Sequence, residues 1–188
     1  TPYANIQSAA FYTNVADTRT DGIELTGNYQ LDLAQWGRLN LSSGFAKNST
    51  QITQLRDVGN IRGDQIVGRA TQGLIEDGTP ETKLVLSANW LYDNWGVTLS
   101  QRRYGEWTSR NASNPDLDQT YSSQWVTDLD LSYTFDKALK VSIGAINLFD
   151  THPDEAEGAQ LYGVPKYSIT SPEGAQGAFY YTSVSYEF

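Results

Sequence analysis

Residues 125–135 read W-V-T-D-L-D-L-S-Y-T-F, with an apolar or aromatic side chain at almost every second position. In an extended chain successive side chains point to opposite sides, so Trp125 and Leu129 share one face while Asp128 and Asp130 share the other. A helical repeat of 3.6 residues does not fit this alternation. The segment therefore predicts a β-strand with one apolar face and one polar face.

The same alternation recurs along the rest of the chain. It is found in six further segments, which are residues 21–31, 39–45, 83–92, 95–100, 139–145 and 180–188. Because the period in each segment is two residues, the predicted fold class is all-β, with about seven antiparallel strands.

The links between the predicted strands alternate between short and long. Short turns fall near residues 32–37, 93–94 and 136–138, and long polar stretches fall near residues 47–81, 108–123 and 150–176. An antiparallel meander with this order has all its short links at one end and all its long links at the other. Outer-membrane β-barrels sort their connections in this way, with short periplasmic turns and long extracellular loops.

Aromatic residues gather near both ends of the predicted strands. The short-turn end has Tyr29, Trp36, Trp90, Tyr92, Trp95, Tyr133, Phe135, Tyr186 and Phe188, and the long-loop end has Phe45, Trp107, Trp125, Phe149 and Tyr180. From Trp125 to Phe135 is about 33 Å of strand, which a tilt near 40° reduces to roughly 25 Å of height. This height fits a membrane flanked by two aromatic girdles. The alternative is a soluble all-β ligand-binding module, such as a lectin-like sandwich, in which two sheets bury these rings.

The composition excludes several kinds of site. The 188 residues include no Cys and one His, His152, so Cys-based zinc sites and thiol nucleophiles are impossible. The formal charge of −9 does not suit binding to nucleic-acid phosphates. No apolar run approaches the roughly 20 residues that a transmembrane helix needs. We therefore expect no enzyme activity, no metal site and no cofactor.

Charged side chains on the polar face predict a wide aqueous lumen, lined by Glu24, Asp128, Asp130 and Lys140. Seven strands cannot enclose it alone, because an open sheet would leave unpaired edges in lipid. The chain also contains no Met, so we expect a processed chain or a piece of a longer one. The strands would then form one segment of a larger antiparallel transmembrane β-barrel.

Three segments resemble motifs of TonB-dependent outer-membrane receptors. Residues 14–25 read N-V-A-D-T-R-T-D-G-I-E-L and resemble the family's Asn, spacer, Gly-hydrophobic-Glu strand. Residues 146–150, I-N-L-F-D, resemble the penultimate-strand motif, and residues 171–188, which contain G-A-F-Y-Y-T-S-V-S-Y-E-F, resemble the closing strand. The three occur in the family's order and nearly span the chain.

The resemblance implies that residues 1–188 are the C-terminal part of a 22-stranded receptor barrel, without its plug domain and N-terminal strands. It implies a bacterial outer-membrane location, contact with lipid, and uptake of a scarce nutrient such as a ferric siderophore, driven by TonB through the plug. The barrel-assembly machinery would recognise the closing-strand residues Tyr180, Val184, Tyr186 and Phe188. His152 departs from the family pattern, which often has an aromatic residue here.

Arginines near the long-loop end predict a site for an anionic ligand. They are Arg56, Arg62, Arg69, Arg102, Arg103 and Arg110. Arg102 and Arg103 are the candidates for pairing with an anionic iron chelate, and Trp107 and Tyr121 for stacking on it. The alternative is that these arginines bind the phosphates of lipopolysaccharide, or no ligand.

Overall fold

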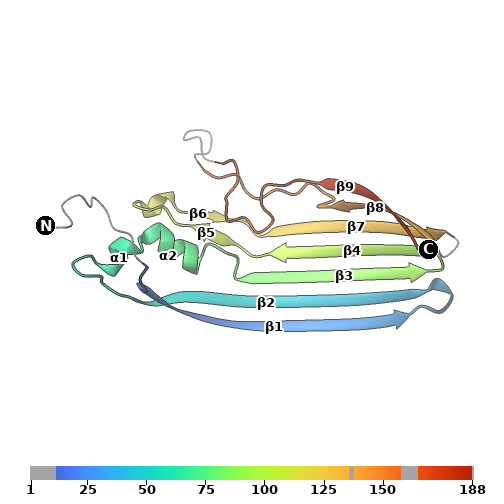
Figure 1. Ribbon diagram of the computed structural model, residues 1–188, viewed down its shortest axis with the longest axis horizontal. Helices are drawn as coiled ribbons and strands as arrows, with labels where there is room; N and C mark the ends of the chain where they lie inside the picture. Colours follow the sequence, from blue (N-terminus) through green and yellow to red (C-terminus); the bar gives the residue numbers. More distant parts are fainter. Residues whose placement is uncertain (1–11, 136–137, 158–164, 188) are drawn as a thin grey trace, which may run out of the picture.

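The computed structural model of the chain describes residues 12–135, 138–157 and 165–187. Seven strands form one antiparallel sheet in the order β1-β2-β3-β4-β7-β8-β9 (Figure 1). They are β1 (Ala16–Asp32), β2 (Arg38–Leu55), β3 (Thr82–Tyr92), β4 (Trp95–Tyr104), β7 (Gln124–Phe135), β8 (Leu139–Ile146) and β9 (Phe179–Tyr186). Each strand pairs with the next of the seven along the chain, so the sheet is a meander. The prediction of an all-β fold with about seven antiparallel strands is confirmed.

The pairing register places apolar side chains together on one side of the sheet. Residues directly opposite each other in an antiparallel pair project to the same side. One such row crosses the sheet through Tyr29, Leu41, Ala88, Leu99, Leu129, Ala145 and Tyr180. The adjacent row, on the other side, runs through Gln30, Asn40, Asn89, Thr98, Asp130, Gly144 and Tyr181. We call these two sides the apolar face and the polar face.

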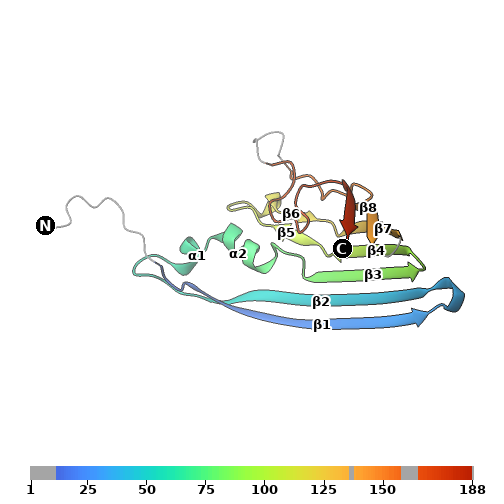
Figure 2. The same cartoon turned by 45° about the vertical axis from the view of Figure 1, so that its right-hand side comes forward.

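Much of the apolar face is exposed. Tyr29 exposes 64% of its surface, Leu99 45% and Trp125 44%. The second sheet found among the described residues has only two strands, β5 (Trp107–Ser109) and β6 (Gln119–Tyr121), and it lies at one end of the large sheet (Figure 1). The lectin-like sandwich required a sheet over these rings, so the structure does not support that alternative. The large sheet also bends, and Figure 2 shows β8 and β9 foreshortened where β1 and β2 appear at full length.

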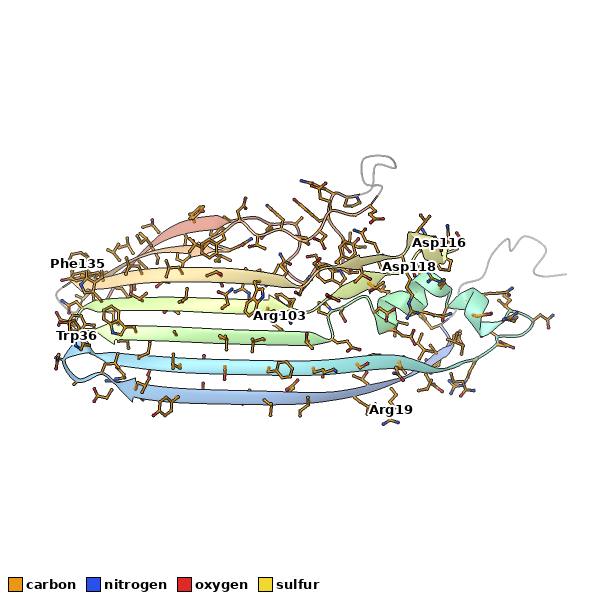
Figure 3. The ribbon with its side chains drawn as sticks, turned by 180° about the vertical axis from the view of Figure 1, so that it is seen from behind. Arg19, Trp36, Arg103, Asp116, Asp118 and Phe135 are labelled. Atoms are coloured by element: carbon orange, nitrogen blue, oxygen red, sulfur yellow. The ribbon has the colours of Figure 1, made fainter. Side chains whose placement is uncertain are left out.

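The connections are sorted between the two ends of the sheet. At one end the short helix η1 (Ala34–Trp36) links β1 to β2, and Asp93 and Asn94 alone link β3 to β4. The long connections at the other end contain α1 (Gly63–Ile66), α2 (Arg69–Glu76), β5, η2 (Pro115–Leu117) and β6. Figure 3 accordingly shows Trp36 and Phe135 at the short-turn end, and Asp116 and Asp118 at the long-loop end. The predicted sorting of the connections is confirmed.

Residues 47–55, predicted as part of a long loop, instead continue β2 and pair with β1. This segment reads K-N-S-T-Q-I-T-Q-L and is polar on both sides of the strand. A strand that is solvated on both faces lacks the two-residue hydrophobic period, although its backbone ladder continues. The β5–β6 hairpin, also predicted as loop, is too short to show a period.

Exposed aromatic rings lie near both ends of the sheet, as predicted. Trp95, Phe135 and Tyr186 are exposed near the short turns, and Trp125 and Tyr180 near the long loops. Trp107 is only 2% exposed and belongs to the β5–β6 hairpin, so its assignment to a girdle is wrong. Phe188 lies outside the described residues. Within the described part of the chain, no helix is long and apolar enough to cross a membrane.

Candidate functional site

Arg102 lies on the polar face of β4, close to the long loops. Its guanidinium group forms ion pairs with Asp128 of β7 and with Glu173 of the loop between β8 and β9. The Nε atom of Arg102 donates to Oε1 of Glu173 at 2.9 Å. The exposed fractions of all three side chains are only 21–22%. Because one cation faces two carboxylates, the cluster has an excess of negative charge.

Further hydrogen bonds on the polar face join β7 to the start of the β8–β9 loop and to β9. Oδ1 of Asp128 accepts a hydrogen bond from the backbone N–H of Asn147 at 2.9 Å. Oδ2 of Asp130 accepts one from the hydroxyl of Tyr181 at 2.8 Å. The Tyr181 ring lies over Gly144 of the neighbouring strand, where any Cβ would overlap the ring. Glycine at this position therefore allows the ring to approach the sheet and reach Asp130.

The segment I-N-L-F-D ends β8 and begins the long loop to β9. Asn147 and Asp150 adopt positive φ angles of 54° and 53°, which Asn and Asp tolerate better than most residues. The Asn147 side chain accepts from the N–H of Thr151 at 2.9 Å and donates to the carbonyl of Thr151 at 2.8 Å. The Asp150 carboxylate accepts from the N–H of Ala178, directly before β9. The motif therefore fastens the beginning of this loop to its end.

The other two long loops are joined to each other by charged groups. Arg69 of α2 contacts both carboxylate oxygens of Asp118 and donates to the carbonyl of Asn111 at 2.7 Å. Arg110 forms an ion pair with Glu76 at 2.9 Å. The hydrogen bonds from Arg69 lower the pKa of Asp118 to about 2, and the same contact raises the pKa of Arg69. We call the pair of Arg69 and Asp118 the loop clasp.

The four predicted ligand-binding residues do not converge on one surface. Arg102 and Arg103 are successive residues of β4 and therefore point to opposite faces. The Arg103 guanidinium lies 5.9 Å from the centre of the Trp125 ring on the apolar face. Trp107 and Tyr121 are 2% and 3% exposed and stack on each other, with ring centres 5.1 Å apart. Burial also raises the pKa of Tyr121.

All four of the other predicted arginines pair with carboxylates. Arg56 contacts Asp17 and Arg62 contacts Asp64, in addition to the pairs of Arg69 and Arg110 described above. His152 lies in the loop after β8, and its ring stacks on the Tyr167 ring with centres 5.2 Å apart.

The four residues predicted to line the lumen share the polar face. The register aligns Glu24 with Ala46 and Lys140 with Thr134, on the side that also bears Asp128 and Asp130. Sequence reasoning missed Glu173, which lies in an irregular loop where no period marks it. Within the described residues, no three His, Asp or Glu side chains gather closely enough to hold a metal ion.

Residues 1–148 match the protein family described as "TonB dependent receptor-like, beta-barrel". No curated protein matches the chain. The solved structures that share its fold include two with a TM-score of 0.56 each. "Copper transporter OprC" is 17% identical over 94% of this chain, and the ferric-catecholate import receptor Fiu from E. coli K12, in its closed form, is 18% identical over 92%. The chain spans 24% of the OprC structure and 21% of the Fiu structure.

Proposed function

Because this chain belongs to the family of TonB-dependent receptor-like β-barrels, we propose that it forms part of the wall of an outer-membrane barrel that imports a scarce nutrient. The family consists of transporters and not of enzymes. In this proposal the apolar face contacts lipid and the polar face lines the aqueous lumen. The single observation that supports it best is the register, which aligns an uncovered apolar row and a polar row across seven strands.

We propose that further strands pair with the two edges of the sheet, β1 and β9. In the sheet of the described residues each of these strands has only one neighbour. Unpaired backbone groups are very unfavourable in lipid, where no water can satisfy them. The 22 strands implied by the family resemblance would close the barrel, with residues 1–188 as its C-terminal part and a separate plug domain in its lumen.

The proposed orientation follows from the sorting of the connections. Short turns would face the periplasm and long loops the outside, as in other outer-membrane barrels. TonB would act from the periplasm through the plug domain. We also propose that the barrel-assembly machinery recognises the closing-strand residues Tyr180, Val184, Tyr186 and Phe188.

We propose a ferric siderophore as the cargo and Arg102 as the cation that meets it. The similarity in fold to Fiu, a ferric-catecholate import receptor, supports this choice. Glu173 lies on a loop and supplies one of the two carboxylates on Arg102, and in this proposal the anionic chelate displaces it from Arg102. Trp107 and Tyr121 stack on each other within the β5–β6 hairpin, so in this proposal they stabilise the hairpin.

The test is uptake by cells that produce the full-length receptor, with and without TonB. We expect TonB-dependent accumulation of iron supplied as a ferric catecholate, and reduced binding of that chelate by Arg102→Gln. Lys83→Gln is a matched control, because Lys83 lies on the polar face of the neighbouring strand, above the Tyr104 ring. Accumulation of copper instead, as the name of OprC would suggest, would overturn the proposed cargo. Uptake that is the same without TonB would overturn the proposed mechanism.

Orientation is tested separately by cysteine labelling. The chain contains no Cys, so Ser113→Cys and Asn94→Cys introduce single labelling sites into this part of the receptor. Ser113 lies in a long loop and Asn94 in a short turn, and both are exposed. An impermeant thiol reagent should modify Ser113→Cys on intact cells and leave Asn94→Cys unmodified until the outer membrane is opened.

A further inference from the structure

A hollow of about 570 Å³ lies on the apolar face, over β1 to β4. Its lining includes three small residues, Gly27, Ser43 and Ala88, and three large apolar ones, Tyr29, Leu86 and Leu99. The register places all six in two neighbouring rows of the apolar face. Small residues surrounded by large apolar ones leave a recess, and an apolar chain that fills it lowers the free energy.

Two cations lie on the same face between this hollow and the long loops. Gln101 lines the hollow, and Arg103 is the next residue of β4 on that face, about 7 Å further along the strand. The row of the apolar face that contains Arg103 also contains Leu84 and Phe45. Lys47 of β2 lies on the same face, one row closer to the long loops. Figure 3 shows Arg103 near the long-loop end of β4.

These cations are free to meet an anion. Within the described residues, neither Arg103 nor Lys47 forms an ion pair with a carboxylate, in contrast to the arginines of the loops. Arg103 also lies beside Trp125, an exposed ring on the apolar face. Indole rings of membrane proteins favour the level of the lipid headgroups. If the apolar face contacts lipid as proposed, Arg103 lies at headgroup level and the hollow lies below it, at the depth of the acyl chains.

We propose that this face binds one phosphorylated lipid of the outer leaflet, lipopolysaccharide, whose phosphates contact Arg103 and Lys47 and one of whose acyl chains fills the hollow. This inference rests on the proposed function, because long loops on the outside place the two cations in the outer leaflet. The planar guanidinium of Arg103 suits bidentate contact with phosphate, and Lys47 adds a second charge. Unpaired cations above an apolar recess match an anionic amphiphile better than they match the apolar surface of another protein.

Native mass spectrometry of the purified full-length receptor in detergent tests the proposal, with bis-phosphorylated lipid A as the probe. The Arg103→Ala/Lys47→Ala double variant should bind lipid A roughly 25-fold more weakly, or about 5-fold for each cation. Lys83→Ala is the matched control, since it removes a cation at a similar height from the polar face, and it should bind like the wild type. Ala88→Leu and Ser43→Leu, which fill the hollow, should each weaken binding while the cations remain.

Equal affinities for the double variant and Lys83→Ala would overturn the assignment of the phosphate contacts. Unchanged affinity in both Ala88→Leu and Ser43→Leu would overturn the assignment of the acyl chain. Phosphatidylglycerol that binds as tightly as lipid A would overturn the choice of lipid. Folding of each variant is checked by heat-modifiable mobility on gels. Lipid A binding and iron uptake are measured independently. If the receptor binds lipid A in this pattern but imports no ferric chelate, the proposed function is wrong and the proposed lipid site stands.

Discussion

Oδ1 of Asp150 accepts a hydrogen bond of 2.8 Å from the backbone N–H of Ala178, a residue 28 positions later in the chain. The contact joins the two ends of the loop between β8 and β9. This loop also supplies Glu173, the partner of Arg102. The I-N-L-F-D motif therefore helps to position a side chain of the candidate functional site without touching it.

Asp150→Ala should free the N–H of Ala178 and loosen the end of this loop. A hydrogen bond to a carboxylate contributes about 1–2 kcal/mol, so hydrogen exchange at Ala178 should become roughly 5- to 30-fold faster. Asp150→Asn keeps an acceptor oxygen and tolerates the positive φ angle, so it should retain most of the protection. Hydrogen exchange in the full-length receptor measures the protection of Ala178 in both variants. Equal rates in the wild type and in Asp150→Ala would contradict the role assigned to the contact.

Arg102→Gln should release the loop that contains Glu173 from the polar face. The variant leaves two carboxylates near each other without the cation that holds them, whereas Glu173→Gln keeps the pair of Arg102 with Asp128. Limited proteolysis should therefore cut residues 165–178 faster in Arg102→Gln than in Glu173→Gln. The opposite order would show that the cation does not hold the loop.

Leu99→Arg should destabilise the folded receptor by about 2–4 kcal/mol in lipid vesicles, because the charge enters the middle of the apolar face. Thr98→Arg is the matched control, since Thr98 lies on the polar face directly opposite Asp130 and the new charge meets a carboxylate. Urea titration of unfolding gives both free energies. A similar loss in the two variants would mean that the two faces of the sheet are wrongly assigned to lipid and lumen.

The loop clasp should make the long loops sensitive to acid. The pKa of Asp118 falls from an ordinary value of 3.8 to about 2, because Arg69 donates hydrogen bonds to the charged form. The clasp therefore contributes its full stability above about pH 4 and loses it as the pH falls toward 2. Proteolysis with an acid-stable protease should show the loops opening over this range. Asp118→Asn should give loops that are equally open at pH 5 and at pH 3.

Replacing Tyr186 and Phe188 together by Ser should lower the amount of folded receptor in the outer membrane. Tyr186 lies on the apolar face of β9, opposite Leu139, and an aromatic row on an edge strand can pair with assembly factors through its backbone and rings. Heat-modifiable, membrane-inserted protein is the readout, and ligand affinity per folded molecule should stay the same. Undiminished insertion would contradict a role in assembly.

The strand cores could be predicted from the sequence because each has one apolar face and one polar face. Leu129 and Asp130 show this most clearly, since neighbouring residues of β7 enter opposite rows that both cross the whole sheet. The extension of β2 over residues 47–55 could not be predicted in this way, because its two faces share one environment. Hydrophobic periodicity records a difference between faces and not the presence of a strand.

The candidate site was less predictable than the fold. Arg102 and Arg103 lie beyond the predicted strand of residues 95–100, and only the observed extension of β4 to Tyr104 shows that they point to different faces. Their partners depend on long-range contacts. Glu173 reaches Arg102 from 71 residues away, and Trp107 meets Tyr121 only when the β5–β6 hairpin forms. Residue type and spacing contain no information on such contacts.

The meander gives the barrel wall a modular construction. In the described sheet neighbouring hairpins pair edge to edge, through a backbone ladder that any other antiparallel strand could supply. Inserting or removing one hairpin would therefore change the circumference while leaving the surroundings of distant strands almost intact. Duplication of a hairpin would enlarge such a barrel and deletion would narrow it, in steps of two strands, while the loops at one end could vary in length independently of the diameter.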